Sequence, residues 1–312
     1  MKRLWIICLL CVFCIEAAVA QNEVETEQAA AYVFTKEELF TNIFLKKGQQ
    51  VIFKVSGGWT MWGGVWGDVD HQGHKNYKKV NELGYLGALV GRVGASDNFL
   101  VEDDMTFVSP ETGRLVLYAN KGTFQDMGSQ GSMEVIIVGA RERSAMEIDQ
   151  MFGWDYSKIN TATVNAAFMS EQEKEMLILM NKARTNPALF AEQYIAHRVY
   201  QGDHVKECFE YMKSAEASEA LVPTGELHGV AVLHATEMGE TGVVKYADGL
   251  YAQNVSVGLK EPEDMLVSML IDKISSITKG HRKNVMSKDY KHVGIAIGAH
   301  VSQGHCGVII FQ

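Results

Sequence analysis

The chain has 312 residues, of which 47% are hydrophobic and 21% are charged, with 29 Gly but only 4 Pro. At roughly 100–200 residues per domain, this length allows about two folded domains. The composition excludes collagen, coiled coils and intrinsically disordered chains. The formal net charge is −9, and no Lys/Arg-rich run exceeds a few residues, so the chain lacks the basic field that attracts phosphate backbones. We therefore expect no nucleic-acid partner.

The first twenty residues have the pattern of a secretory signal peptide. A cationic start at Lys2 and Arg3 precedes an apolar run over residues 4–15, and Ala18 and Ala20 form a small-x-small cleavage site. The apolar run is shorter than the roughly 20 residues that a membrane-spanning helix needs. We predict cleavage after Ala20, a secreted or periplasmic location and no transmembrane segment in the mature chain.

Two cysteines, Cys208 and Cys306, remain after removal of the signal peptide. An exported chain meets an oxidising compartment, which favours a disulfide between them. Such a bond would close a long loop and contribute about 4–5 kcal/mol in the chain-entropy model. The alternative interpretation is two separate buried thiols.

Residues 31–140 have the pattern of short β-strands. The segments 51–55, 114–118 and 133–138 are rich in β-branched or aromatic residues, and clusters of Gly, Asn, Asp and Ser separate them. Several strands of this length with Gly-rich turns indicate an antiparallel β-sandwich.

From about residue 170 the hydrophobic period becomes helical. Ser170 and Glu173 have the spacing of a capping box, which predicts the start of a helix. Pro187 and Pro262 each predict the start of another helix, because proline suits a first helical turn and disfavours the α conformation in the residue before it.

Two β runs, 293–297 and 308–311, follow the predicted helices. Residues 141–169 show no clear period, and we predict that they form a linker between a domain at 31–140 and a domain at 170–312. The change of period along the chain predicts an α+β fold class.

Four segments of the second half occur in an order that is typical of one superfamily. They are 175–187 (EMLILMNKARTNP), 233–238 (LHATEM), 253–258 (QNVSVG) and 280–285 (GHRKNV). Residues 170–312 resemble the CAP or SCP superfamily of cysteine-rich secretory proteins, antigen 5 and pathogenesis-related 1 proteins, and its bacterial branch in particular. The resemblance implies an α-β-α sandwich with helices on both sides of a mainly antiparallel sheet.

Members of that superfamily often carry a cleft in which two His and two acidic residues hold a divalent metal. The resemblance places His281 and Asp272 in this cleft as candidate zinc ligands, since imidazole and carboxylate groups suit that ion. Gln253 stands where the family has a Glu, and the second His is missing. Tyr246 and His234 complete our candidate cleft residues. Half of the metal tetrad is absent, which argues against a hydrolytic metal centre, because zinc sites have three or four protein ligands.

Structural roles are the alternatives for several of these residues. His281 could make a hydrogen bond at the end of a helix, Gln253 could tie two loops together, and His234 could pack in a core. No Ser-His-Asp or Cys-His arrangement for nucleophilic catalysis stands out in the sequence.

A cluster of tryptophans marks the first half. Trp59, Trp62 and Trp66 lie among glycines, and Asp68 and Asp70 follow. Clustered Trp beside a Gly-rich loop provides a stacking floor for a pyranose ring, while carboxylates bind sugar hydroxyls or calcium. The alternative is that some of these tryptophans, Trp59 first, belong to the core of the sandwich.

Residues 35–140 resemble a second family on the segments 45–48, 57–59, 89–92, 113–118 and 131–135. Their order is similar to the galactose-binding-like, jelly-roll-like sandwich of small bacterial galactose-specific lectins. In those lectins the loop after the Leu-Tyr strand supplies calcium and sugar ligands. Thr123 and Asp126 keep polar groups in this loop, but Lys121 replaces the calcium-ligand Asp and argues against calcium-dependent galactose binding.

These observations predict a secreted or periplasmic binding protein. Its first domain would bind a glycan or another cell-envelope ligand, and its CAP-like domain would not catalyse a reaction. One alternative is a metal-assisted hydrolase of peptide or envelope polymer, and another is an interaction protein without a small-molecule site. A lipid is a further candidate ligand if Met265 and Met269 line a cavity, although core packing is the simpler interpretation of that stripe.

Overall fold

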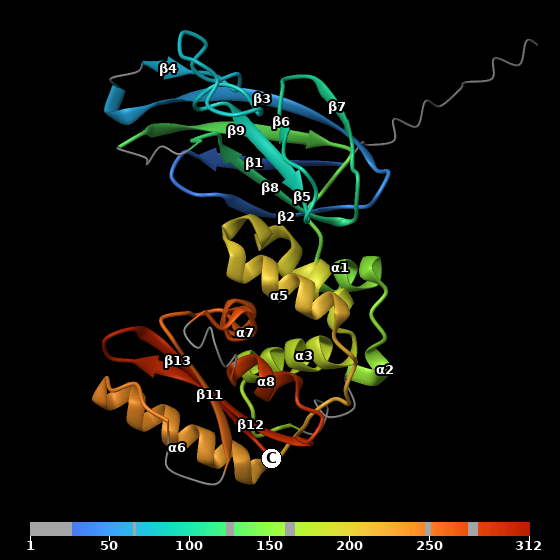
Figure 1. Cartoon of the computed structure of the whole chain (residues 1–312), viewed down its shortest axis with the longest axis vertical. Helices are drawn as coiled ribbons and strands as arrows, with labels where there is room; N and C mark the ends of the chain where they lie inside the picture. Colours follow the sequence, from blue (N-terminus) through green and yellow to red (C-terminus); the bar gives the residue numbers. More distant parts are fainter. Residues whose placement is uncertain (1–26, 65–66, 123–127, 160–165, 247–250, 274–279) are drawn as a thin grey trace, which may run out of the picture.

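The structure is a computed structural model that describes residues 27–64, 67–122, 128–159, 166–246, 251–273 and 280–312, apart from the side chain of Trp62. Its first half consists of antiparallel sheets, and its second half contains helices on both sides of another sheet (Figure 1). The predicted α+β class is therefore confirmed. The predicted signal peptide lies outside the described residues. Among those residues, no helix combines the length and apolar character needed to cross a membrane.

Two antiparallel sheets pack face to face in the first half. One has the order β1-β9-β3-β4, with β7 also paired to β3, and the other has the order β2-β8-β5-β6. The first contains β1 (Gln28–Phe34), β9 (Gln130–Val138), β3 (Gln50–Thr60), β4 (Asp68–Val69) and β7 (Met105–Val108). The second contains β2 (Leu39–Leu45), β8 (Gly113–Ala119), β5 (Leu89–Val93) and β6 (Phe99–Leu100). The predicted strand segments fall within β3, β8 and β9.

The core of the sandwich contains Trp59. Its side chain is 1% exposed, and its indole Nε1 donates a hydrogen bond to the backbone oxygen of Gly87 at 3.0 Å. Gly87 has a φ of +77°, and a Cβ there would lie 3.2 Å from that indole nitrogen, so this position favours glycine on both counts. The core interpretation of Trp59 is confirmed.

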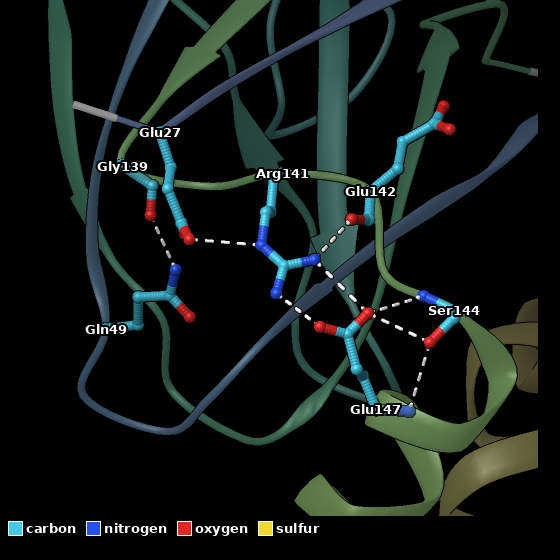
Figure 2. A network of polar contacts seen from close by, with 7 residues as sticks. All are labelled: Glu27, Gln49, Gly139, Arg141, Glu142, Ser144 and Glu147. Carbon is cyan, nitrogen blue, oxygen red and sulfur yellow. Dashed lines mark hydrogen bonds and ion pairs between the residues drawn. The ribbon is translucent and has the colours of Figure 1, made fainter. Parts of the chain in front are cut away.

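The predicted linker contains two helices, α1 (Ala145–Phe152) and α2 (Tyr156–Ile159). Ser144 and Glu147 form a capping box at the start of α1. Figure 2 shows Arg141 between Glu27, which precedes β1, and Glu147; its Nε donates to Glu27 at 3.0 Å. The guanidinium of Arg141 thus links the start of β1 to the first turn of α1 and helps to orient α1 relative to the sandwich.

A buried polar cluster holds α1 against the second half. The Nζ of Lys182 lies 2.5 Å from a carboxylate oxygen of Asp149 and donates to the hydroxyl of Tyr194 at 2.8 Å. The other Asp149 oxygen accepts from Gln193 Nε2 at 2.9 Å, and the oxygen of that amide accepts from the Trp154 indole. Burial lowers the pKa of Lys182, and the contact with Asp149 opposes this effect. The carboxylate of Asp149 therefore stabilises the buried ammonium.

Four strands form the sheet of the second half, in the order β10-β12-β13-β11. They are β10 (Val222–Pro223), β12 (His292–His300), β13 (Gly304–Phe311) and β11 (Ala252–Val257). The β10–β12 pair is parallel, and the other pairs are antiparallel. The helices are α3 (Glu171–Thr185), α4 (Pro187–Phe190), η3 (Ala191–Ile195), η4 (Ala196–Gln201), α5 (Asp203–Ser214), α6 (Gly225–Thr241), α7 (Pro262–Ile271) and α8 (Gly280–Met286).

Helices cover both faces of this sheet, as the resemblance implied (Figure 1). Helix α6 packs on β12 and β13 from one side, and α3 and α7 contribute to a separate cluster on the other side. The predicted helix starts at Ser170, Pro187 and Pro262 are confirmed. Met265 and Met269 are buried in the core cluster, which favours core packing, although Met269 also lines the cleft described below.

The two cysteines belong to different clusters. Cys208 lies on α5 in the cluster with α3 and α7, whereas Cys306 on β13 packs with α6. Both are buried thiols, and burial raises the pKa of Cys306. The predicted disulfide is wrong, because the sheet separates the two side chains.

The junction between the two halves is built on charged side chains. Arg92 of β5 is fully buried; its Nη1 and Nη2 donate to the carboxylate of Glu38 at 3.1 and 2.8 Å, and Nη2 also donates to the backbone oxygen of His197 at 2.8 Å. The ring of His197 packs edge-on against Phe40. Helix η4 is thereby held against the outer face of the β2-β8-β5-β6 sheet.

The Lys182–Asp149 pair gives a first prediction. We expect Lys182→Met to lower the free energy of unfolding by about 3–5 kcal/mol, because it leaves a buried carboxylate without its cation. The double variant Lys182→Met/Asp149→Leu should lose clearly less than the sum of the single variants, measured by urea denaturation. Single variants that each cost under about 1 kcal/mol would contradict this role.

His197 gives a second prediction, on pH. Neither ring nitrogen has a hydrogen-bond partner within the described structure, and burial, with Arg114, Arg198 and Arg92 nearby, lowers the pKa of His197 well below its ordinary value. The unfolded chain binds a proton near pH 6.5 and the folded chain does not, so stability falls as the pH drops below that value, by up to about 1.4 kcal/mol per pH unit.

Urea denaturation at pH 5.0 and 7.0 measures this slope. The variant His197→Phe should show a smaller loss of stability at pH 5.0 than the wild type, while the exposed control His204→Gln should not differ from it. Equal slopes in the wild type and His197→Phe would contradict the assignment.

Candidate functional site

A cleft of about 310 Å³ opens in the second half between residues 244–246, β11, the end of α7 and the start of α8. His281, Asp272 and Tyr246 line it, and Val257 and Met269 add apolar walls. Three of the five predicted cleft residues therefore come together.

These three side chains contact one another in a row, with His281 between Tyr246 and Asp272. The hydroxyl of Tyr246 lies 2.7 Å from His281 Nε2, and His281 Nδ1 lies 3.3 Å from a carboxylate oxygen of Asp272. An ionised carboxylate only accepts, so Nδ1 carries the proton and Nε2 accepts from the phenol. Both imidazole nitrogens thus have partners within the protein.

Backbone geometry aims the carboxylate of Asp272 at His281. Asp272 follows α7 with a φ of 49°, a left-handed conformation that short polar side chains tolerate better than most. Its own N–H donates to Ser268 and ends the helix, while its second carboxylate oxygen accepts from the backbone N–H of His281 at 2.9 Å. One side chain therefore fixes both the ring and the backbone of His281.

Two amide side chains, the buried Asn254 and the half-buried Asn284, hold α8 on β11, and the sequence analysis missed both. Asn284 Nδ2 donates to the side-chain oxygen of Asn254 at 2.9 Å and to the backbone oxygen of Gln253 at 3.2 Å, and Asn254 Nδ2 donates to the backbone oxygen of His281 at 2.9 Å. Both asparagines lie in the quoted motifs. The available signal was an amide in the same motif as the apolar Val255 and Val257, because an amide needs hydrogen-bond partners when it is buried.

The other two predicted cleft residues lie outside the cleft lining. His234 is buried on α6, and its Nε2 contacts the backbone oxygen of Lys245 at 2.9 Å, which positions the segment next to Tyr246. The structure thus supports the alternative packing role of His234 and not its prediction as a cleft residue. Gln253 contributes its backbone oxygen to Asn284, as described above.

The arrangement does not fit a metal centre. Within the described ranges, no three His, Cys, Asp or Glu side chains gather in a way that could hold a metal ion. His281 and Asp272 contact each other, and Tyr246 takes the remaining imidazole nitrogen. We derive no metal-dependent step at this cleft.

A neutral phenol and charged side chains lie in or near the cleft. Burial and the nearby Asp272 raise the pKa of Tyr246, so its phenol stays protonated. The Nζ of Lys245 lies 2.6 Å from a carboxylate oxygen of Glu237, a contact that lowers the pKa of that Glu. Lys273 also lines the cleft and is exposed.

The sugar-binding candidates of the first half are placed only in part. Trp66, Thr123 and Asp126 and the side chain of Trp62 lie outside the described residues. Asp68 and Asp70 are exposed and line one open groove beside β3 and β9; a carboxylate oxygen of Asp70 accepts from the backbone of Gln72 at 2.9 Å.

No family model and no curated protein matches the chain. Among solved structures, it is similar to the N-terminal domain of EclA, a PllA-like lectin, with 22% identity and a TM-score of 0.28 over 35% of this chain and 93% of that one. It is also similar to a cysteine-rich secretory protein from Staphylococcus aureus, with 12% identity and a TM-score of 0.23 over 58% of this chain and 50% of that one. These neighbours agree loosely with the two families that the sequence resembles, but at such TM-scores neither carries an argument about function.

Asp272 allows a test of the cleft geometry with two matched variants. We expect Asp272→Asn to cost under about 1 kcal/mol, since Asn tolerates a positive φ and still accepts hydrogen bonds. Asp272→Gly suits the same backbone but removes every acceptor, and should cost about 1–3 kcal/mol by urea denaturation. A glycine variant as stable as the wild type would show that the carboxylate does not organise the cleft.

Proposed function

We propose that the protein is a secreted or periplasmic two-domain binding protein. Its β-sandwich, residues 31–140, engages a glycan or another cell-envelope ligand. Its CAP-like domain, residues 170–312, binds a ligand in the cleft at His281 without metal-dependent catalysis.

The contacts of His281 with Tyr246 and Asp272 carry the proposal for the second domain. A metal ion needs a lone pair on a His nitrogen that the protein leaves available, and both His281 nitrogens already have partners. The walls combine apolar side chains with a phenol and an imidazole, which is the composition of sites that bind small molecules by burial and a few polar contacts. This composition supports binding over hydrolysis.

The groove at Asp68 and Asp70 supports the proposal for the first domain. It is open to solvent, and the two carboxylates are exposed in it. Carboxylate oxygens accept hydrogen bonds from sugar hydroxyls, and they need no calcium ion to do so.

A hydrolase is the second candidate, because phenol, imidazole and carboxylate follow one another as nucleophile, base and orienting group do in covalent catalysis. The raised pKa of Tyr246 makes its phenolate harder to form. The binding function is therefore the better supported of the two.

Metal analysis and glycan binding on the full mature chain, starting at Gln21, test the proposal. We expect no stoichiometric zinc after dialysis against excess Zn²⁺, in the wild type and in His281→Ala alike. On a glycan array, Asp68→Asn/Asp70→Asn should lower the signal at least about tenfold, while the exposed control Glu226→Gln leaves it unchanged.

Three results would contradict the proposal. Stoichiometric zinc that His281→Ala abolishes would contradict binding without a metal. Cleavage of peptides or peptidoglycan that both Tyr246→Phe and His281→Ala abolish would establish the hydrolase. A glycan array without any signal above background would remove the glycan function of the first domain.

A further inference from the structure

A second cleft, of about 350 Å³, lies at the junction of the two halves and contains none of the cleft or groove residues discussed above. Residues 36–38, Asn81, Tyr118 and Lys121 of the β-sandwich line it, together with Tyr200 of η4. Its volume is in the range of pockets that hold small molecules, about 300–1,000 Å³. The first half alone would lack the wall formed by Tyr200.

The floor of this junction cleft is rigid. The guanidinium of Arg92, held by Glu38 and the backbone of His197, lies 5.5 Å from the ring centre of Tyr118 and 5.0 Å from that of Tyr200. The hydroxyl of Tyr200 donates to the backbone oxygen of Ser96 at 3.0 Å. Both rings are thus fixed before any ligand arrives, which reduces the ordering cost of binding.

Reciprocal amide hydrogen bonds fix another part of the lining. Asn81 Nδ2 donates to Asn120 Oδ1 at 2.8 Å, and Asn120 Nδ2 donates back at 3.0 Å. The Nζ of Lys121 donates to the backbone oxygen of Lys36 at 2.7 Å, and Glu37 adds an exposed carboxylate. The lining therefore carries both hydrogen-bond donors and acceptors.

The charges select the class of ligand. Lys36, Lys121 and Arg92 stand against Glu37 and Glu38, so the cleft favours neither a strongly anionic nor a strongly cationic molecule. Sugar hydroxyls both donate and accept hydrogen bonds, and the apolar face of a pyranose packs on an aromatic ring. We propose that the junction cleft binds a neutral saccharide, with Tyr200 and Glu37 as contact residues.

Binding at this place depends on the docked arrangement of the two halves, since the lining comes from both. A saccharide that binds only the docked form stabilises that form by mass action. The cleft would thus couple glycan capture by the β-sandwich to the position of the CAP-like domain.

The experiment is a saturation-transfer NMR and calorimetric titration of the full mature chain with galactose, glucose, N-acetylglucosamine and lactose, each at up to about 10 mM. We expect at least one sugar to bind, and we expect Tyr200→Ala or Glu37→Gln to weaken its affinity about tenfold or more. The variant Tyr200→Phe keeps the ring and should change the affinity less than threefold. The exposed control Tyr32→Ala should not change it, and circular dichroism checks that every variant is folded.

The results separate this proposal from the proposed function. If Tyr200→Ala and Glu37→Gln leave sugar binding intact while Asp68→Asn/Asp70→Asn abolishes it, the junction cleft is overturned and the groove of the first domain stands. If Tyr200→Ala alone abolishes binding in the folded protein, the junction cleft is the glycan site. If none of the four sugars binds, the proposal that the junction cleft binds a saccharide is overturned. The zinc measurement at His281 does not depend on that result.

Discussion

The position of the two halves depends on one buried guanidinium. Arg92 has no access to water, so its charge must be compensated inside the protein. Glu38 supplies the charge from the same half, whereas the backbone oxygen of His197 comes from the other half. Undocking would therefore leave the guanidinium without one acceptor and expose the faces of Phe40 and Tyr118. The tyrosine walls of the junction cleft and the environment of His197 both follow from this arrangement.

Local signals in the sequence predicted most of the secondary structure. The β-branched runs in β3, β8 and β9, the capping box at Ser170 and the prolines at the starts of α4 and α7 act through backbone sterics and local hydrogen bonds, so they need no knowledge of tertiary contacts. The same capping-box spacing occurs at Ser144 and Glu147 and predicts α1. The helix is short and its segment lacks a clear hydrophobic period, so the capping box is the main local signal for it.

The tertiary interactions were much harder to predict. An arginine in a strand normally indicates a solvent-facing position, because Arg is rarely buried without a partner, and the partners of Arg92 lie in distant parts of the chain. The motif that contains His281 identified the cleft. The left-handed backbone of Asp272 and the hydrogen bonds of Asn254 and Asn284, however, depend on how α7, α8 and β11 pack together. Sequence spacing carries no information on that packing. The disulfide prediction failed for a related reason, since only the sheet topology puts Cys208 and Cys306 on opposite faces.

The cleft at His281 shows how contacts within the protein can order a polar site. Among the described residues, no three His, Cys, Asp or Glu side chains gather there to hold a cation. Without a cation, the lone pair of His281 Nε2 would be left without a partner in a partly buried position, at a cost typical of an unsatisfied acceptor, about 1–3 kcal/mol. The phenol of Tyr246 supplies the missing donor at 2.7 Å. The contacts with Tyr246 and Asp272 therefore hold the imidazole in one orientation. A ligand that enters the cleft meets a preorganised polar wall beside Met269 and Val257.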